Sequence, residues 1–127
     1  TWWPVYDRNL HEPLKHRLHI TGSILLVEGN YLLLDEKPYR SLSALCDYCV
    51  FIQAEENLLR DRLIDRKSRG GLSNEQAEVF YEKSDRCNVQ RVLHNRLNSD
   101  EVWKLCTDGG YRLISRSFDE SWQTFCE

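Results

Sequence analysis

Two short apolar runs with a helix-forming stretch between them constrain the fold of this chain more than any other feature. The first run covers residues 24–27 and ends in Glu28 and Gly29, and the second covers residues 48–52. Apolar runs of this length are typical of strands buried on both faces of a parallel sheet. Residues 36–46 carry apolar side chains at helical spacing, so the sequence predicts the order strand, helix, strand, with 24–27 as a central strand.

Two longer helices are predicted in the middle of the chain. Residues 55–69 begin with acidic side chains and stop at a pair of glycines, 70–71. Ends of this kind suit the helix dipole and a glycine terminator. Ser73 and Gln76 have the spacing of a capping box, in which each side chain accepts from the other residue's backbone N–H group. A second helix therefore begins here and is expected to continue towards Arg96.

The last third of the chain predicts strands. Residues 102–106 and 111–115 flank Asp108-Gly109-Gly110, a tight-turn sequence, and predict a strand pair. Residues 118–127 show no clear period and are expected to be a tail that follows a domain portion covering 1–117. Strands that alternate with helices in one sheet need parallel neighbours and right-handed crossovers. The predicted fold class is therefore α/β, a doubly wound, mainly parallel sheet with helices on both faces.

The composition excludes several classes of protein. The 127 residues contain 17 Lys and Arg against 20 Asp and Glu, a net charge of -3, and 41% are hydrophobic. Such a chain is expected to have a core and has no general attraction for nucleic acid or an anionic membrane. No apolar run approaches the roughly 18 residues that cross a bilayer. We expect a cytoplasmic protein whose partner is a small-molecule substrate, with no nucleic acid or membrane partner; a homodimer is left open.

Cys46 and Cys49 form an isolated C-x-x-C among five cysteines. The pair has the spacing of half a zinc site or of a redox motif. No second pair stands at metal-ligand spacing, and Cys49 opens an apolar run, so two semi-buried, reduced thiols are the favoured interpretation. The chain contains no Met and begins with Thr1, which suggests a processed product or a fragment.

Glu28 is the first candidate for chemistry, because ligands bind at the carboxyl ends of strands in open α/β sheets. A carboxylate there can hold Mg²⁺, or the water shell of the ion, beside nucleotide phosphates. A single acidic residue after an apolar strand is common. A helix cap or a salt-bridged acid is therefore the alternative.

Cationic residues are concentrated in the predicted helix 55–69: Arg60, Arg62, Arg66, Lys67 and Arg69. Arg62, Arg66 and Arg69 fall at i, i+4 and i+7 and share one face. Three guanidinium groups on one face suit phosphate, because each planar fork bonds two oxygens at once. Asp61 and Asp65 interleave with them, and Asp65 can pair with Arg69, so a solvated charge network is an equal alternative. The glycine pair that follows could act as the hinge of a lid.

An aromatic and charged segment precedes the first apolar run. Residues 3–8 read Trp-Pro-Val-Tyr-Asp-Arg and are predicted to be irregular. Asp7 could accept hydrogen bonds from a substrate hydroxyl while Tyr6 or Trp3 supplies an apolar wall, the usual make-up of a small-molecule pocket. A packed loop with Asp7 and Arg8 paired at the surface is equally compatible with these residues.

Three segments together resemble one family in order and spacing. They are 3–8, then Ile-Leu-Leu-Val-Glu-Gly-Asn-Tyr-Leu-Leu-Leu at 24–34, then Leu-Arg-Asp-Arg-Leu-Ile-Asp-Arg-Lys at 59–67. The family is the uridine kinase-like group of P-loop kinases, to which bacterial pantothenate kinases are related. The chain is most similar to its bacterial nucleoside or nucleotide kinase-like and fructose-transport-system kinase-like members, from about residue 2 to residue 113. Ser84-Asp85 and Asn88 also fit.

The resemblance implies phosphoryl transfer from ATP, with Mg²⁺, to a small hydroxylated metabolite such as a nucleoside, a pantothenate-like acid or a sugar. It implies a P-loop NTPase-type doubly wound sheet. The roles that it implies can be placed residue by residue. They are acceptor binding by Tyr6, Asp7, Arg8 and Asn88, magnesium binding by Glu28, action on the phosphates by Arg62 and Arg66, and nucleotide or lid positions for Arg60 and Arg69.

The sequence departs from the family at one motif. No stretch reads G-x-x-x-x-G-K-[ST], so the backbone cradle, the phosphate lysine and the magnesium hydroxyl are missing. In the family this loop and an acidic catalytic base precede the segment that resembles 3–8, and we expect both to lie upstream of Thr1. We therefore expect the chain alone to be inactive, and its sheet to have an exposed edge that makes it poorly soluble.

Two other function classes compete with a kinase. A stand-alone binding or regulatory module would keep the acceptor segment and the lid but perform no chemistry. A P-loop hydrolase would transfer the phosphoryl group to water instead of to an organic acceptor. Nothing in the sequence selects one acceptor, because specificity depends on the shape of the pocket.

Overall fold

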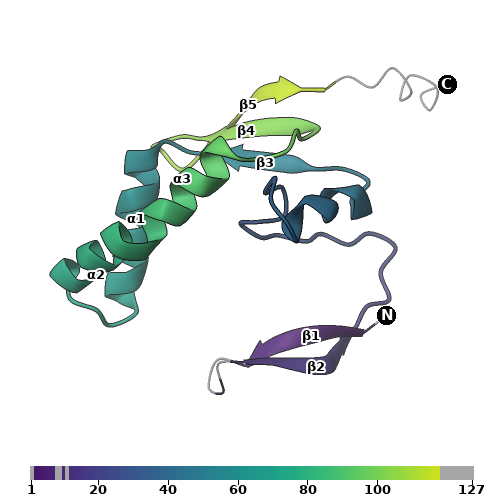
Figure 1. Cartoon of the computed structure of the whole chain (residues 1–127), viewed down its shortest axis with the longest axis horizontal. Helices are drawn as coiled ribbons and strands as arrows, with labels where there is room; N and C mark the ends of the chain where they lie inside the picture. The colour runs from purple at the N-terminus through teal and green to yellow at the C-terminus, as the bar shows by residue number, and fades with distance from the viewer. Residues whose placement is uncertain (1, 8–9, 11, 118–127) are drawn as a thin grey trace.

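The computed structural model describes residues 2–7, 10 and 12–117, which form two separate small sheets and a set of packed helices (Figure 1). The elements, in chain order, are β1 (Trp2–Asp7), β2 (Glu12–His19), two 3₁₀ turns η1 (Tyr39–Ser41) and η2 (Ser43–Leu45), β3 (Val50–Gln53), α1 (Glu56–Arg69), α2 (Asn74–Phe80), a π-helical turn η3 (Tyr81–Asp85), α3 (Arg86–His94), β4 (Glu101–Leu105) and β5 (Tyr111–Arg116). The α/β class is confirmed. None of the helices in the described ranges combines the length and the apolar character that a membrane-spanning helix needs.

The larger sheet has the order β3-β4-β5 and is mixed. β3 and β4 are parallel, as expected of a strand-helix-strand unit, and β4 and β5 are antiparallel. The turn between β4 and β5 contains Gly109 at φ +86°, a left-handed conformation that favours glycine, so the predicted tight turn is confirmed. Among the described strands only β3 and β4 pair in parallel, so the prediction of a mainly parallel sheet is wrong for this part of the chain.

Burial in this sheet is confined to its middle strand. Val102 and Leu105 of β4 are buried, whereas Val50 and Ile52 of β3 are about half exposed. The strand predicted at 48–52 is confirmed, but its predicted burial is wrong. A strand at the edge of a sheet has a neighbour on one side, and in the described chain β3 has only β4.

The helical part agrees with the prediction. α1 covers Glu56–Arg69 and ends at Gly70. The capping box is present: the Gln76 backbone N–H donates to Ser73 Oγ at 3.2 Å, and the Ser73 backbone N–H donates to Gln76 Oε1 at 3.0 Å. α2, η3 and α3 then run without a break from residue 74 to His94, close to the expected end.

A small apolar core joins α1 to the following helices. Ile64 of α1, Ala77 of α2 and Tyr81 of η3 are buried together, and Leu63 packs against them. Tyr81 is 1% exposed, which makes it one of the two largest fully buried side chains in the described residues. This core fixes which face of α1 is turned inwards.

The first apolar run does not form a strand. Residues 24–27 have no regular structure, and Ile24 and Leu26 are more than 90% exposed. The prediction of a buried central strand is therefore wrong for this structure. A strand is buried only when neighbouring strands pair with it, and no described strand pairs with this segment.

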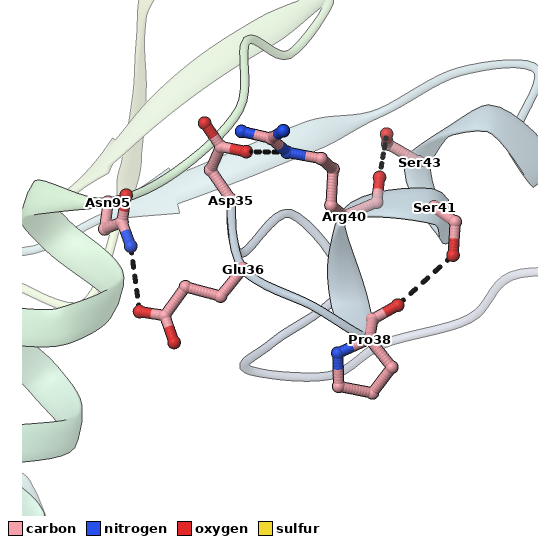
Figure 2. Close-up of polar contacts among 7 residues, drawn as sticks. All are labelled: Asp35, Glu36, Pro38, Arg40, Ser41, Ser43 and Asn95. Atoms are coloured by element: carbon pink, nitrogen blue, oxygen red, sulfur yellow. Dashed lines mark hydrogen bonds and ion pairs between the residues drawn. The ribbon is translucent and has the colours of Figure 1, made fainter.

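The helix predicted at 36–46 is replaced by η1 and η2. Figure 2 shows that Ser41 Oγ donates to the Pro38 carbonyl and Ser43 Oγ to the Arg40 carbonyl. Hydroxyl groups that bond to nearby backbone carbonyls compete with regular helix bonds, and Pro38 lacks an N–H group. Short 3₁₀ turns result.

The segment predicted to be irregular at 3–8 is largely a strand. β1 pairs with β2 in an antiparallel hairpin, with Trp2 opposite His19 and Asp7 opposite Glu12. The register shifts between Trp3 and Val5, where Pro4 cannot donate to the ladder. The prediction of a loop is wrong up to Asp7; Arg8 lies outside the described residues, as does the predicted tail at 118–127.

Candidate functional site

The cationic face of α1 is the feature that carries most of the candidate site. Ile64 points into the core, and successive helix positions are rotated by about 100°. Arg62 and Arg66 each lie two positions from Ile64, so each is about 160° from the buried side and close to the other. Both are exposed. Packing through Ile64 therefore turns this pair of guanidinium groups to the surface.

The other cationic side chains of the helix are held by acidic partners. Arg69 makes a two-point contact with Asp65, at 2.6 and 3.2 Å, which confirms the predicted pair. Arg60 lies 3.6 Å from both Asp61 and Glu78 and 5.8 Å from the centre of the Tyr81 ring. Each of these guanidinium groups has part of its charge balanced within the described chain.

Lys67 is tied to the next helical segment. Its Nζ lies 3.5 Å from the centre of the Phe80 ring and 3.5 Å from Asp85 Oδ2, and both the Lys67 and the Asp85 side chains are mostly buried. Asp85 Oδ2 has no hydrogen bond within the described chain, so its contact with Lys67 is an ion pair without a hydrogen bond. The sequence analysis missed it, because 18 positions separate the partners and no short-range spacing signals such a contact.

Arg62 and Arg66 differ from their neighbours in having no ion-pair partner within the described parts of the chain. Two exposed guanidinium groups one helical turn apart present up to ten N–H donors and two positive charges. Phosphate oxygens are the partners best matched to this geometry.

A shallow groove lies beside this face, between α1 and α2. Its volume is about 290 Å³, and it is lined by Arg60, Asp61, Ile64, Asp65, Ser68, Asn74 and Glu78. Three of the lining residues are acidic, and Arg62 and Arg66 are not among the lining residues. An anion would therefore meet the exposed face of the helix and not this groove.

Tyr6 and Asp7 stand at the end of β1. Tyr6 is 58% exposed, and one Asp7 oxygen, Oδ1, accepts the backbone N–H of Leu10 at 3.0 Å. Asp7 therefore closes the hairpin loop in this structure. In Figure 1 the hairpin lies well apart from α1. The structure does not bring the hairpin strand that carries Tyr6 and Asp7 together with the arginine face of α1.

Glu28 and Asn88 belong to other segments of the chain than α1, which carries the arginine pair. Glu28 lies in the exposed irregular segment after residues 24–27, and Asn88 is exposed on α3, one turn after η3. No group of three or more His, Cys, Asp or Glu side chains in the described residues could hold a metal ion. Glu28 therefore fits Mg²⁺ only as one ligand among others, which suits an ion that takes few protein carboxylates and keeps waters and phosphate oxygens.

The segment that leads from Glu28 towards β3 is clamped to α3. Arg91 Nε donates to both Glu36 oxygens, at 3.0 and 3.1 Å. The Asn95 side chain donates to Glu36 at 2.8 Å (Figure 2). The hydrogen bonds from Arg91, and then that from Asn95, hold the pKa of the Glu36 carboxyl below its usual value. Leu34 is buried and forms an isolated bridge with Arg96, which adds to the clamp.

No protein-family model matches the chain. Three curated proteins are similar to it. The uncharacterized protein YggC of Escherichia coli K12 is 42% identical over 113 residues, which cover 89% of this chain and 48% of YggC. ATP-dependent kinase-like protein notR' of Aspergillus versicolor is 27% identical, with 89% and 66% covered. A Schizosaccharomyces pombe protein named provisionally as a uridine kinase is 28% identical, with 78% and 44% covered. The chain thus spans about half to two thirds of the length of these relatives.

Two solved structures are similar in fold. A protein named provisionally as a fructose transport system kinase, from Silicibacter sp. TM1040, superposes with a TM-score of 0.75 at 26% identity, over 81% of this chain and 51% of its own. YFH7 of Saccharomyces cerevisiae, described provisionally as a circularly permuted P-loop kinase, gives 0.65 at 19% identity and shows the fold alone. The chain is distantly homologous to uridine kinase-like and fructose transport kinase-like P-loop kinases, over part of their length.

Proposed function

We propose that the protein containing this chain transfers a phosphoryl group from ATP, with Mg²⁺, to a hydroxyl group of a small metabolite: a nucleoside, a pantothenate-like acid or a sugar. The observation that carries the proposal is the exposed pair Arg62 and Arg66, the two arginines of α1 that lack an acidic partner in the described chain. Distant homology to P-loop kinases supports it, and notR' is named as ATP-dependent.

Arg62 and Arg66 are proposed to act on the transferring phosphoryl group. In phosphoryl transfer the protein contributes positioning and electrostatic stabilisation, and charge spreads over the equatorial oxygens of the transferring group. Two planar donors without a competing carboxylate can bind those oxygens without first breaking an ion pair. Arg60 and Arg69, proposed for the nucleotide side of the lid, would have to exchange Glu78 and Asp65 for a phosphate.

The hairpin is proposed to provide the acceptor pocket. Tyr6 offers an exposed aromatic wall, and Asp7 a carboxylate of which Oδ1 is engaged by Leu10. Arg8 and Asn88 are proposed to complete the contacts to the acceptor. Tyr6 and Asp7 belong to β1, and the β1-β2 hairpin lies apart from α1 in Figure 1, so a productive site requires the hairpin to approach the arginine face.

Glu28 is proposed to bind Mg²⁺ directly or through water. The ion would neutralise phosphate charge, and Glu28 would supply one of its ligands. The 127 residues contain no G-x-x-x-x-G-K-[ST] segment to cradle the phosphates. The chain by itself is therefore expected to be inactive, and the activity is proposed for the complete gene product.

Kinetics of arginine variants in the complete gene product test this proposal. Arg62→Ala and Arg66→Ala should each lower kcat by about a hundredfold, the effect of removing one transition-state donor, with a much smaller change in KM for the acceptor. Arg112→Ala on β5, another exposed arginine, is the matched control and should leave both constants unchanged. Wild-type turnover in the Arg62→Ala and Arg66→Ala variants would indicate that this helix face is a solvated charge network without a role in catalysis.

A non-catalytic binding or regulatory module is the second candidate. The missing phosphate loop motif favours it, because a chain without that cradle can still bind an anion at the arginine pair. Titration of the 127-residue chain with tripolyphosphate distinguishes an arginine pair that binds anions from an arginine pair that is only solvated. The module predicts saturable binding that Arg62→Ala weakens and Arg112→Ala does not.

A further inference from the structure

A groove lies along α2 and the start of η3, apart from the arginine pair of α1. Its volume is about 560 Å³, and it is lined by Glu75, Gln76, Val79, Phe80, Lys83 and Ser84. Arg62 and Arg66 are not among the lining residues. Figure 1 shows α2 at the outer end of the helical part, away from the sheet β3-β4-β5. A second molecule can therefore approach this surface.

The middle of the groove is apolar and fixed in place. Val79 and Phe80 are 52% and 43% exposed. Lys67 Nζ lies 3.5 Å from the centre of the Phe80 ring and holds that ring against α1. Exposed apolar side chains that are grouped and rimmed by polar residues are typical of a protein interaction surface.

The charged side chains of residues 74–85 fall into two sets. Three acidic side chains have cationic partners within the described chain, in the pairs Glu78–Arg60, Glu82–Arg86 and Asp85–Lys67. The other two charged residues, Glu75 and Lys83, are exposed, line the groove and have no ion-pair partner in the part of the chain that the structure describes. A partner molecule can therefore use both charges without breaking an existing pair.

The positions of these two charges indicate which partner fits. Glu75 and Lys83 stand four positions on either side of Val79, about one helical turn each way. A second copy of this segment, laid antiparallel with the two Val79 side chains facing each other, presents Lys83 to Glu75 and Glu75 to Lys83. In a two-fold interface each contact occurs twice, so the pattern supplies two ion pairs. A parallel copy would set like charges opposite each other.

We propose that this face is a homodimer interface, at which α2 and the start of η3 of two copies pack antiparallel about Val79. Val79 and Phe80 form the apolar centre and the two pairs of Glu75 with Lys83 form the rim, the usual arrangement of a protein interface. The face covers little more than two helical turns, so it buries less area than a standard stable dimer and the association is weak and reversible. The rim charges mainly set the partner and the register. The proposal does not depend on phosphoryl transfer.

Sedimentation analysis of the complete gene product tests the interface. The wild-type protein should pass from monomer to dimer in the micromolar range. Val79→Asp places two carboxylates opposite each other at the two-fold axis and should abolish the dimer; circular dichroism checks that the fold is kept. Arg112→Glu, a charge reversal at an exposed residue of β5, is the matched control and should leave the dissociation constant unchanged. A gene product that stays monomeric up to millimolar concentration, or a dimer that Val79→Asp does not weaken, would overturn the proposal.

Exchange of the two charges tests the antiparallel pairing itself. Glu75→Lys and Lys83→Glu each turn both ion pairs into like-charge contacts and should raise the dissociation constant about tenfold. The double variant restores two contacts between opposite charges and should recover most of the wild-type affinity. An equimolar mixture of the two single variants should form a heterodimer, because every contact then joins a lysine to a glutamate. A double variant and a mixture that both stay as weak as the single variants would contradict the two-fold arrangement.

Discussion

Tyr81→Phe is predicted to stabilise the chain. Tyr81 is 1% exposed in the core that seats α1, and its hydroxyl is buried without a hydrogen-bond partner in the described structure. An unpaired buried hydroxyl costs about 1–3 kcal/mol, whereas the phenylalanine ring fills the same space. We expect the free energy of unfolding to rise by about 1 kcal/mol, at the low end because the site can relax. The rise should increase Tm by about 4 °C in a chain of this size.

Chemical denaturation followed by circular dichroism measures the effect. The matched control is Tyr111→Phe on β5, where the side chain is 55% exposed and water can satisfy the hydroxyl; it should leave stability within about 0.5 kcal/mol of wild type. A loss of stability in Tyr81→Phe would refute the reasoning, because it would mean that the hydroxyl has a partner in the folded chain. It would also mean that the core around Tyr81 is packed differently, and this packing is the basis for the outward position of Arg62 and Arg66.

Two further predictions concern carboxylates. Arg91 and Asn95 lower the pKa of Glu36 in the folded chain. The contribution of Glu36 to stability is therefore present above its unfolded pKa and is lost as the pH falls through its folded pKa. Glu36→Gln should reduce the loss of unfolding free energy below about pH 4.5, and an unchanged dependence of stability on acid pH would contradict the contacts of Glu36 with Arg91 and Asn95. In the complete gene product, Glu28→Gln should raise the Mg²⁺ concentration needed for half-maximal turnover, and an unaltered magnesium titration would remove Glu28 from the proposed site.

Elements defined by short-range rules could be predicted from the sequence. α1, its glycine end, the capping box at Ser73 and the turn at Gly109 all depend on residues a few positions apart, and all are confirmed. The strand at 24–27 could not be predicted correctly from its apolar pattern, because burial depends on neighbouring strands that pattern does not specify. β1 was predicted to be irregular, whereas it is a strand in which a register shift between Trp3 and Val5 accommodates Pro4.

The candidate site, like the fold, could be predicted only in part from the sequence. Helical spacing placed Arg62 and Arg66 on one face, and the packing of Ile64 agrees with an exposed position. Spacing alone could not show which cations of α1 are engaged, because Glu78 and Asp85 belong to the following helical segment. It also could not show that the hairpin lies apart from α1 (Figure 1). Tertiary contacts decide both points.

Phosphorus NMR of the reaction products tests the central claim most directly. The complete gene product is incubated with ATP, Mg²⁺ and a panel of nucleosides, pantothenate-like acids and sugars. The account predicts ADP and a new phosphate monoester with one acceptor, and loss of that monoester signal in an Arg62→Ala, Arg66→Ala double variant but not in Arg112→Ala. Inorganic phosphate as the sole product would indicate a hydrolase, and unchanged ATP would indicate a binding module; either result would contradict the proposed kinase.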